Sequence, residues 1–132
     1  MRQINLKAIL KIVGLILLIT SVSFLFCIPV ALFYDETLWP FLLSSVVTLV
    51  PGLMLYFLIR YSLNEKVSTR EGYLSVTLAW LTLVLCGALP YLFSGVITDF
   101  IKALFESTSG YTTTGASIIA DVESVPKSIL FW

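Results

Sequence analysis

One polar stretch stands out in an otherwise apolar chain: the residues ESTSGYTTTGA, which run from Glu106 to Ala116. Hydroxyl groups, glycines and a carboxylate are costly inside a hydrocarbon layer unless they line water or coordinate a solute. Backbone carbonyls and threonine hydroxyls can replace the hydration shell of a potassium ion, and because they carry no full charge the ion can leave again. The residue types of this stretch therefore predict the coordination of a dehydrated monovalent cation.

The candidate ion-binding residues form the second half of the stretch: Thr112, Thr113, Thr114, Gly115 and Ala116. An extended segment whose neighbouring carbonyls all point inward requires φ values that only glycine adopts readily, and Gly115 meets that requirement. We expect potassium to bind at Thr113, Thr114 and Gly115. From spacing alone, an ordinary external loop rich in turn-forming residues explains TSGYTTTGAS equally well.

Three residues before the threonines are expected to support the ion-binding segment: Glu106, Ser109 and Gly110. Glu106 could stabilise cations electrostatically or brace the segment through hydrogen bonds to its backbone, and we favour the bracing role. Two further carboxylates, Asp121 and Glu123, follow the segment and are interpreted as solvated loop charges.

A short helix should precede the ion-binding segment. Thr98 or Asp99 can act as its N-cap, and Gly110 is well placed to end it. One face of this helix is largely apolar, and comprises Phe100, Ile101, Leu104, Phe105 and Thr108. A helix of about twelve residues is ~18 Å long, which is too short to cross a bilayer. Together with TTTGA, the pattern predicts a re-entrant loop that enters the membrane from outside and returns extended.

The rest of the chain is built to cross a membrane. Of the 132 residues, 58% are hydrophobic and only 12% are charged, and the mean hydropathy is +0.99. Three apolar blocks, Ile12–Tyr34, Leu38–Ile59 and Tyr73–Ile97, are each long enough for one helical crossing. We therefore predict an all-α membrane protein with three transmembrane helices, one re-entrant pore helix and an extended filter strand. Kinks are expected at the prolines inside the three blocks, Pro29, Pro51 and Pro90.

The same composition excludes several functions. The net charge is zero and histidine is absent, so neither a nucleic-acid surface nor the commonest general base is available. No carboxylate pair or nucleophile–base set suggests an enzyme, and no cofactor is expected. Cys27 and Cys86 lie inside apolar blocks and are interpreted as buried packing residues rather than as a disulfide or metal pair. Glu65 and Glu71 lie in a polar loop and should be solvated or paired.

The basic residues predict which side of the membrane faces the cytoplasm. Six of the eight precede the first block or lie between the second and the third: Arg2, Lys7, Lys11, Arg60, Lys66 and Arg70. By the positive-inside rule, the amino terminus is cytoplasmic and the segment after Ile97 begins outside. A cleavable signal peptide is the alternative interpretation of the first block, but an apolar run of about 22 residues exceeds the roughly 7–15 of a signal h-region.

Four motifs give the chain a resemblance to a known family. FESTSGYTTTGAS followed by VPKSILFW resembles the first pore loop of the TrkH/TrkG membrane subunits of bacterial Trk-type potassium uptake systems. TREGYLSVTLAW and GALPYLFSG resemble the same family's third helix. The resemblance implies four repeats of helix, pore loop and helix, preceded by two extra helices. The related KtrB subunits lack that extra pair, which the first two apolar blocks of this chain match.

The resemblance also assigns parts of the chain to that fold. Residues 1–72 would form the two amino-terminal helices and a cytoplasmic loop, and residues 73–132 the first pore repeat without its second helix. In that repeat Tyr73–Ile97 is the first helix, Asp99–Gly110 the pore helix and Thr112–Ala116 the filter strand, whose glycine is the family's filter glycine. Compared with the TVGYG filter of potassium channels, TTTGA has a single glycine, so looser discrimination against sodium is expected.

The function implied by the resemblance is potassium uptake across a bacterial cytoplasmic membrane through a filter lined by carbonyls and hydroxyls. The implied partners are potassium, membrane lipid, the remaining pore repeats, a second copy of the subunit and a TrkA-type cytoplasmic nucleotide-binding subunit. One filter strand supplies too few oxygens to replace a hydration shell, so residues 1–132 alone should give no potassium flux. Two rival interpretations are a small homo-oligomeric cation channel and a truncated membrane protein that transports nothing.

Overall fold

The computed structural model describes residues 6–59 and 68–132, and every regular element in these two ranges is a helix. In chain order the helices are α1 (Leu6–Leu25), α2 (Ile28–Phe33), α3 (Trp39–Leu58), α4 (Thr69–Gly87), α5 (Leu89–Ser94), α6 (Phe100–Tyr111) and α7 (Lys127–Phe131). Three spans are long and apolar enough to cross a membrane: Leu6–Phe33, Trp39–Leu58 and Thr69–Ser94. The predicted all-α membrane fold with three transmembrane helices is confirmed.

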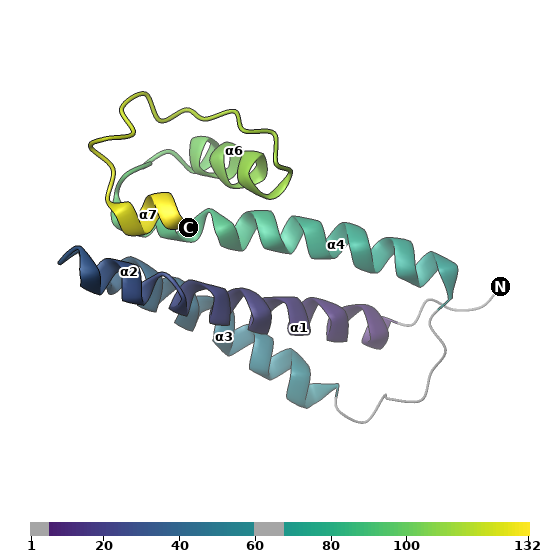
Figure 1. Ribbon diagram of the computed structural model, residues 1–132. Coiled ribbons are helices and arrows are strands. Elements are labelled where there is room, and N and C mark those ends of the chain that lie inside the picture. The colour runs from purple at the N-terminus through teal and green to yellow at the C-terminus, as the bar shows by residue number, and fades with distance from the viewer. Residues whose placement is uncertain (1–5, 60–67) are drawn as a thin grey trace.

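The short helix α6 folds back along α4. α1 packs on both α3 and α4, while α6 packs on α4 and α7 packs on α2. Figure 1 shows α6 running back toward the middle of the bundle, and the segment after it returning to the end where α6 began. α6 and the segment after it thus begin and end at the same end of the bundle, and their re-entrant passage into a membrane stays a prediction.

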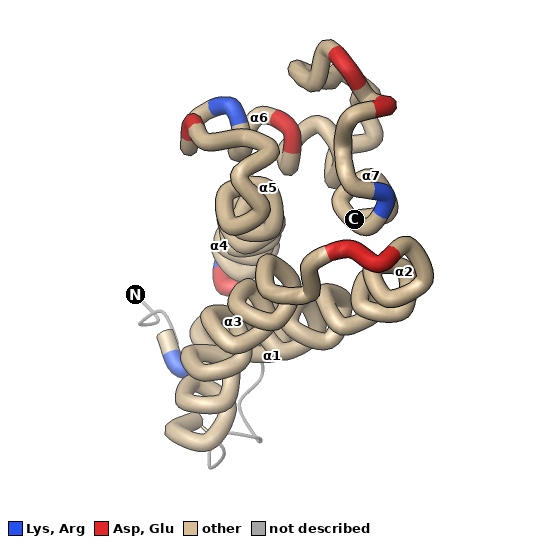
Figure 2. Tube along the Cα trace, turned by 90° about the vertical axis from the view of Figure 1, so that its left-hand side faces the viewer, with Lys and Arg blue, Asp and Glu red and all other residues tan. Residues whose placement is uncertain are grey.

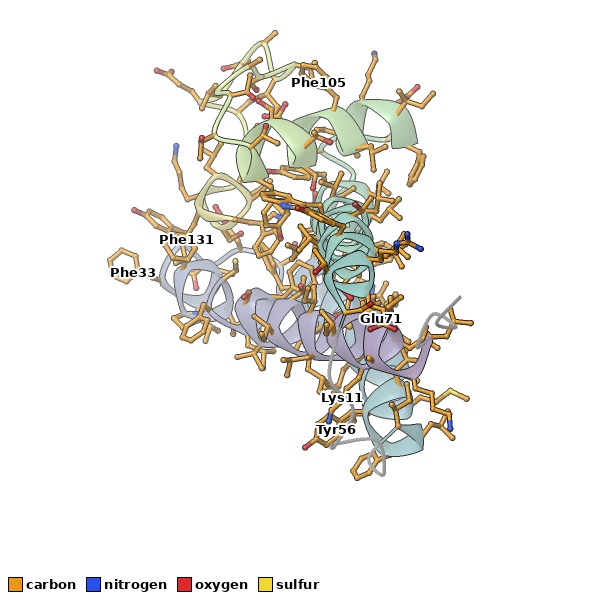
Figure 3. The ribbon with its side chains drawn as sticks, turned by 90° about the vertical axis from the view of Figure 1, so that its right-hand side faces the viewer. Lys11, Phe33, Tyr56, Glu71, Phe105 and Phe131 are labelled. Atoms are coloured by element: carbon orange, nitrogen blue, oxygen red, sulfur yellow. The ribbon has the colours of Figure 1, made fainter. Side chains whose placement is uncertain are left out.

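The helix of the third span begins at Thr69, earlier than Tyr73 where the apolar block starts. The cause is a capping box. The Ser68 hydroxyl accepts a hydrogen bond from the Glu71 backbone at 3.5 Å, and the Glu71 carboxylate accepts one from the Ser68 backbone at 2.6 Å. Glu71 is only 3% exposed and lies between α4 and α1 (Figure 3). Of the two fates expected for Glu71, solvation is therefore excluded, and Glu65 lies outside the described residues.

Two of the three prolines interrupt their helices as expected. Pro29 and Pro90 lie in the first turn of α2 and of α5. Backbone N–H groups in a first turn have no intrahelical acceptor, so a proline there costs the helix no hydrogen bond. The preceding helices end at Leu25 and Gly87. Pro51 lies inside α3, which continues through it without a break. The first and third spans are therefore broken helices, and the second is one continuous helix.

Small residues let α1 and α3 approach closely. A Cβ added at Gly14 would lie 2.9 Å from the Cβ of Leu55. On the facing helix, a Cβ added at Gly52 would lie 3.1 Å from the Cβ of Leu17. Membrane helices pack through such small residues because lipid removes the hydrophobic driving force between them.

A pair of serines joins the same two helices. The Ser21 hydroxyl lies 3.0 Å from the Ser45 carbonyl, and the Ser45 hydroxyl lies 3.2 Å from the Ser21 carbonyl. The two hydroxyl oxygens are 2.9 Å apart, and both side chains are buried. Each helix therefore offers a buried polar partner to the other.

α6 docks on the end of α4 at Gly87. A Cβ added at Gly87 would lie 2.5 Å from both Ser107 Oγ and Tyr111 Cε2, so the contact requires glycine. Ser107 Oγ donates a hydrogen bond of 2.8 Å to the Val84 carbonyl. The helix that leads into TTTGA is thus positioned directly by the third span.

Replacing Gly87 with alanine should displace α6, because the added methyl overlaps Ser107 and Tyr111. We expect the free energy of unfolding to fall by about 1–3 kcal/mol, as is typical of overpacking in a filled contact. Unfolding of the purified protein in detergent measures this change. The matched control is Gly72→Ala in the same helix, where nothing lies within 4 Å of an added Cβ. Equal destabilisation by the two variants would contradict the role assigned to this contact.

Candidate functional site

α6 is a helix of 12 residues that begins immediately after Asp99. The Asp99 carboxylate accepts a hydrogen bond of 3.0 Å from the Lys102 backbone, so Asp99 rather than Thr98 is the N-cap. Such a helix is only ~18 Å long and cannot cross a bilayer core of ~30 Å. The prediction that Gly110 ends the helix was wrong, because α6 continues through Tyr111.

The first threonine of the ion-binding segment extends the end of α6. Both the backbone N–H and the hydroxyl of Thr112 donate to the Thr108 carbonyl, at 2.9 and 2.7 Å. These two bonds continue the last turn past Gly110. Gly110 therefore keeps a negative φ inside the helix and is not a left-handed cap.

A Schellman motif then closes the helix three residues after Gly110. The Thr113 N–H donates to the Gly110 carbonyl at 3.1 Å, and the Thr114 N–H donates to the Ser109 carbonyl at 3.0 Å. Ser109 and Gly110, which were expected to support the ion-binding segment, thus contact its backbone through their carbonyls. The Ser109 hydroxyl is buried and has no hydrogen-bond partner in the part of the chain that the structure describes.

Two residues of the ion-binding segment have left-handed backbone conformations. Gly115 has a φ of +74°, a value that glycine adopts readily and that was expected at this position. Thr113 has a φ of +55°, which the sequence did not predict and which is rare for a β-branched residue. Strained residues of this kind cost on the order of 1–3 kcal/mol and cluster at ligand-binding sites. At Thr113 the Schellman motif holds the backbone in this conformation, because Thr113 is its left-handed residue.

Glu106 holds the far end of the ion-binding segment. Its Oε1 accepts a hydrogen bond of 2.7 Å from the Ser117 hydroxyl, and its Oε2 accepts one of 3.0 Å from the Ile118 backbone. These are the bracing hydrogen bonds that we expected of Glu106. Together with the Schellman motif, they attach residues 112–118 to α6 at both ends.

The carboxylates beyond the segment are exposed loop residues, as expected. The Asp121 side chain accepts a hydrogen bond of 3.1 Å from the Glu123 backbone, and both residues are exposed. Asp121 also lines, together with Asp99 and Lys102, a cavity of about 430 Å³ beside the start of α6.

The apolar face predicted for α6 does not attach this helix to the bundle. Ile101 and Phe105 are 76% and 47% exposed, and Figure 3 shows Phe105 on the side of α6 away from α4. The buried residues are small: Ala103, Ser107 and Ser109. As at α1 and α3, small residues allow the close approach. The large apolar side chains face the surroundings of the bundle instead.

Sequence reasoning missed the contacts of two residues, Trp132, which packs beside Tyr111, and Glu36, which binds α7. The Trp132 indole N–H donates to the Gly87 carbonyl at 2.9 Å. Its ring centroid lies 4.5 Å from that of Phe24 and 6.3 Å from that of Tyr111. The Glu36 carboxylate binds the start of α7. No local pattern could have found these hydrogen bonds, because their donors and acceptors are 45 to 92 residues apart in the sequence.

The fold, with three helices long and apolar enough to span a membrane, is that of a membrane protein. A sequence profile of the TrkH family, described as cation transport proteins, matches residues 40–132, and the chain belongs to this family. The resemblance of the four sequence motifs to the TrkH/TrkG family is therefore confirmed.

Several known proteins are similar to the chain. The Trk system potassium uptake protein TrkH of Halomonas elongata is 34% identical over 130 residues, and that of Vibrio parahaemolyticus is 40% identical over 131 residues. The crystal structure of the potassium transporter TrkH from Vibrio parahaemolyticus matches with a TM-score of 0.89 and 38% identity. These matches cover 96–97% of this chain but only 26–28% of the relatives, so the chain spans about a quarter of their length.

Glu106→Gln should loosen the chain at Ser117 and Ile118, because an amide offers one acceptor oxygen in place of two. Hydrogen exchange at the Ile118 backbone amide should become about tenfold faster, as expected when a hydrogen bond to a charged group is lost. Mass spectrometry of the protein in detergent measures the exchange. Glu123→Gln removes the same charge from an exposed residue and should leave Ile118 unchanged. If both variants speed exchange equally, the bracing role is wrong.

Proposed function

We propose that this chain is the amino-terminal part of a potassium uptake protein in which residues 112–116 supply one strand of the ion filter. The observation that carries the proposal is the left-handed backbone at Thr113 and Gly115, directly after a helix too short to cross the membrane. A backbone that alternates between left-handed and ordinary residues can turn several carbonyls to one side. Cation coordination by carbonyl oxygens needs that arrangement.

Potassium is the ion that we propose, because the relatives from Halomonas elongata and Vibrio parahaemolyticus are described as potassium uptake proteins. The ligands on this chain are carbonyl and hydroxyl oxygens of Thr113, Thr114 and Gly115. These neutral oxygens can offset dehydration without holding the ion permanently. The remaining ligands come from the other pore repeats of the full-length subunit, since this chain spans only 26–28% of the relatives.

Within that subunit, residues 1–72 form an amino-terminal helical pair with a cytoplasmic loop, and residues 73–132 belong to the first pore repeat. The protein lies in a bacterial cytoplasmic membrane and also binds lipid. Its partners are a second copy of the subunit and a TrkA-type nucleotide-binding subunit on the cytoplasmic side.

The amino terminus is cytoplasmic in this proposal. α1 and α4 begin at the same end of the bundle (Figure 1), so Lys7, Lys11 and Arg70 gather there, which supports the orientation. The other three basic residues of the argument lie outside the described residues: Arg2, Arg60 and Lys66.

Gly115→Ser should raise the potassium concentration that the full-length protein needs for half-maximal uptake. At a φ of +74° any side chain strains the backbone, and the carbonyls of the filter must shift to relieve it. We expect an increase of roughly tenfold, because left-handed strain of about 1–2 kcal/mol corresponds to a factor of that order. Uptake is measured in cells that lack other potassium uptake systems.

The matched control is Gly95→Ser. Gly95 caps α5 with a φ of +75° and also has nothing within 4 Å of an added Cβ, so the strain is the same but lies outside the filter. It should change the amount of protein and leave the potassium dependence intact. Thr114→Val should be milder than Gly115→Ser, because the Thr114 hydroxyl already contacts that of Thr112 at 2.8 Å. Indistinguishable uptake by Gly115→Ser and the parent protein would remove Gly115 from the ion path.

Cysteine labelling tests the orientation. Thr37 lies in the hairpin between α2 and α3, and Thr69 lies at the start of α4, and both are exposed. Thr37→Cys should react with a membrane-impermeant thiol reagent in intact cells, whereas Thr69→Cys should react only after the membrane is opened. The parent protein, with its own Cys27 and Cys86, gives the background. The reverse pattern would overturn the orientation and the side from which α6 enters.

A further inference from the structure

The carboxylate of Glu36 joins the hairpin between α2 and α3 to the start of α7. Its Oε1 accepts a hydrogen bond of 2.5 Å from the Lys127 backbone. Its Oε2 accepts two hydrogen bonds from Ser128, at 2.8 Å from the backbone and 2.5 Å from the hydroxyl. Figure 2 shows the acidic hairpin lying beside α7. One side chain thus receives three donors from a segment more than 90 residues later.

The hairpin holds the backbone of Glu36 through a Schellman motif of its own. Asp35 takes the left-handed position, with a φ of +54°. The Glu36 N–H donates to the Ala31 carbonyl at 2.8 Å, and the Asp35 N–H donates to the Leu32 carbonyl at 3.4 Å. The position of Glu36 is therefore set by the end of α2, independently of α7.

α7 in turn contacts the chain just after the candidate filter segment. An apolar cluster at its start contains Cys27, Phe41, Val125 and Ile129. Ile119, the residue that follows the Glu106 brace at Ile118, packs against this cluster. Any movement of α7 therefore reaches the end of the segment.

The other end of α7 contacts the residue just before the segment. Trp132 follows α7, donates to the Gly87 carbonyl and packs its ring edge-on against Tyr111. Tyr111 is the last residue of α6, and Thr112 comes next. The clamp at Glu36 is thus connected to both ends of residues 112–119.

We infer that Glu36 is a positioning residue for the filter: by clamping α7 it sets the geometry of both ends of residues 112–119, and so the affinity for potassium. The inference rests on the proposed function. The amino-terminal helical pair supplies no filter residue, but through Glu36 it takes part in ion binding.

Glu36 is ionised at neutral pH. Burial alone would raise its pKa, but hydrogen bonds from Ser128 and Lys127 and the charge of Lys127 outweigh burial and lower the pKa below its usual value. The charged groups around it are Asp35 on its own hairpin and Lys127 on α7. Because the pKa is lower in the folded protein, the clamp is fully present above the unfolded pKa and is lost as the pH falls through the lowered value. Glu36→Gln imitates that lost state at neutral pH.

The test compares Glu36→Gln with Asp35→Asn in the full-length protein. Both remove one carboxylate from the same hairpin, and asparagine tolerates the left-handed backbone of Asp35. Potassium uptake is measured against concentration and normalised to the protein in the membrane. Glu36→Gln should raise the half-saturating potassium concentration by about three- to tenfold with a nearly unchanged maximal rate, since hydrogen bonds to a charged group are lost. Asp35→Asn should match the parent protein.

A second variant covers the case in which Glu36→Gln does not accumulate. Ser128→Ala removes one donor and keeps the carboxylate and both backbone hydrogen bonds, so it should shift the half-saturating concentration in the same direction by less. A merely structural role would lower the amount of protein and the maximal rate and leave the half-saturating concentration alone. An unchanged half-saturating concentration in Glu36→Gln would overturn the inference. If Glu36→Gln does not accumulate, the same result in Ser128→Ala would overturn it.

The filter variant separates failure of this inference from failure of the proposed function. If Gly115→Ser impairs potassium uptake and Glu36→Gln behaves like Asp35→Asn, only the role of Glu36 is wrong. If the parent protein takes up no potassium, the proposed function is wrong and the inference falls with it.

Discussion

The candidate site depends on the close approach of α6 to the end of α4 at Gly87. The last turn of any helix leaves carbonyls without intrahelical partners, and inside a membrane each unsatisfied carbonyl is expensive. Here the Gly87 carbonyl, in the last turn of α4, accepts from Trp132, and the Val84 carbonyl accepts from Ser107 in addition to the Ala88 backbone. The segments before and after the ion-binding residues therefore meet on one turn of α4. The absence of a side chain at Gly87 makes room for Ser107 and Tyr111 of α6.

Sequence alone predicted the features that local chemistry determines. The three spans follow from the length of the apolar blocks, and the left-handed Gly115 follows from its lack of a side chain. The sequence placed the N-cap of α6 at Thr98 or Asp99, and the structure shows that it is Asp99. Glu106 could be predicted as a brace because its partners lie only 11 and 12 residues further along the chain.

The features that sequence missed arise from competition between local preferences and longer-range bonds. Glycine is the preferred left-handed residue at a helix end, yet Thr112 extends the helix and moves that position from Gly110 to Thr113. The apolar face of α6 looked like its packing face, but close approach to α4 requires small residues instead. No local sequence pattern indicated the contacts of Glu36, because its hydrogen-bond partners are at positions 127 and 128.

The serine pair between α1 and α3 has a consequence for how the family can evolve. Each hydroxyl of Ser21 and Ser45 lies within hydrogen-bond distance of the other residue's carbonyl. Because these acceptors belong to the backbone, a serine whose partner has changed to alanine still has a carbonyl to donate to, and no buried hydroxyl is left unpaired. The two positions can therefore change one at a time, through intermediates with a single serine.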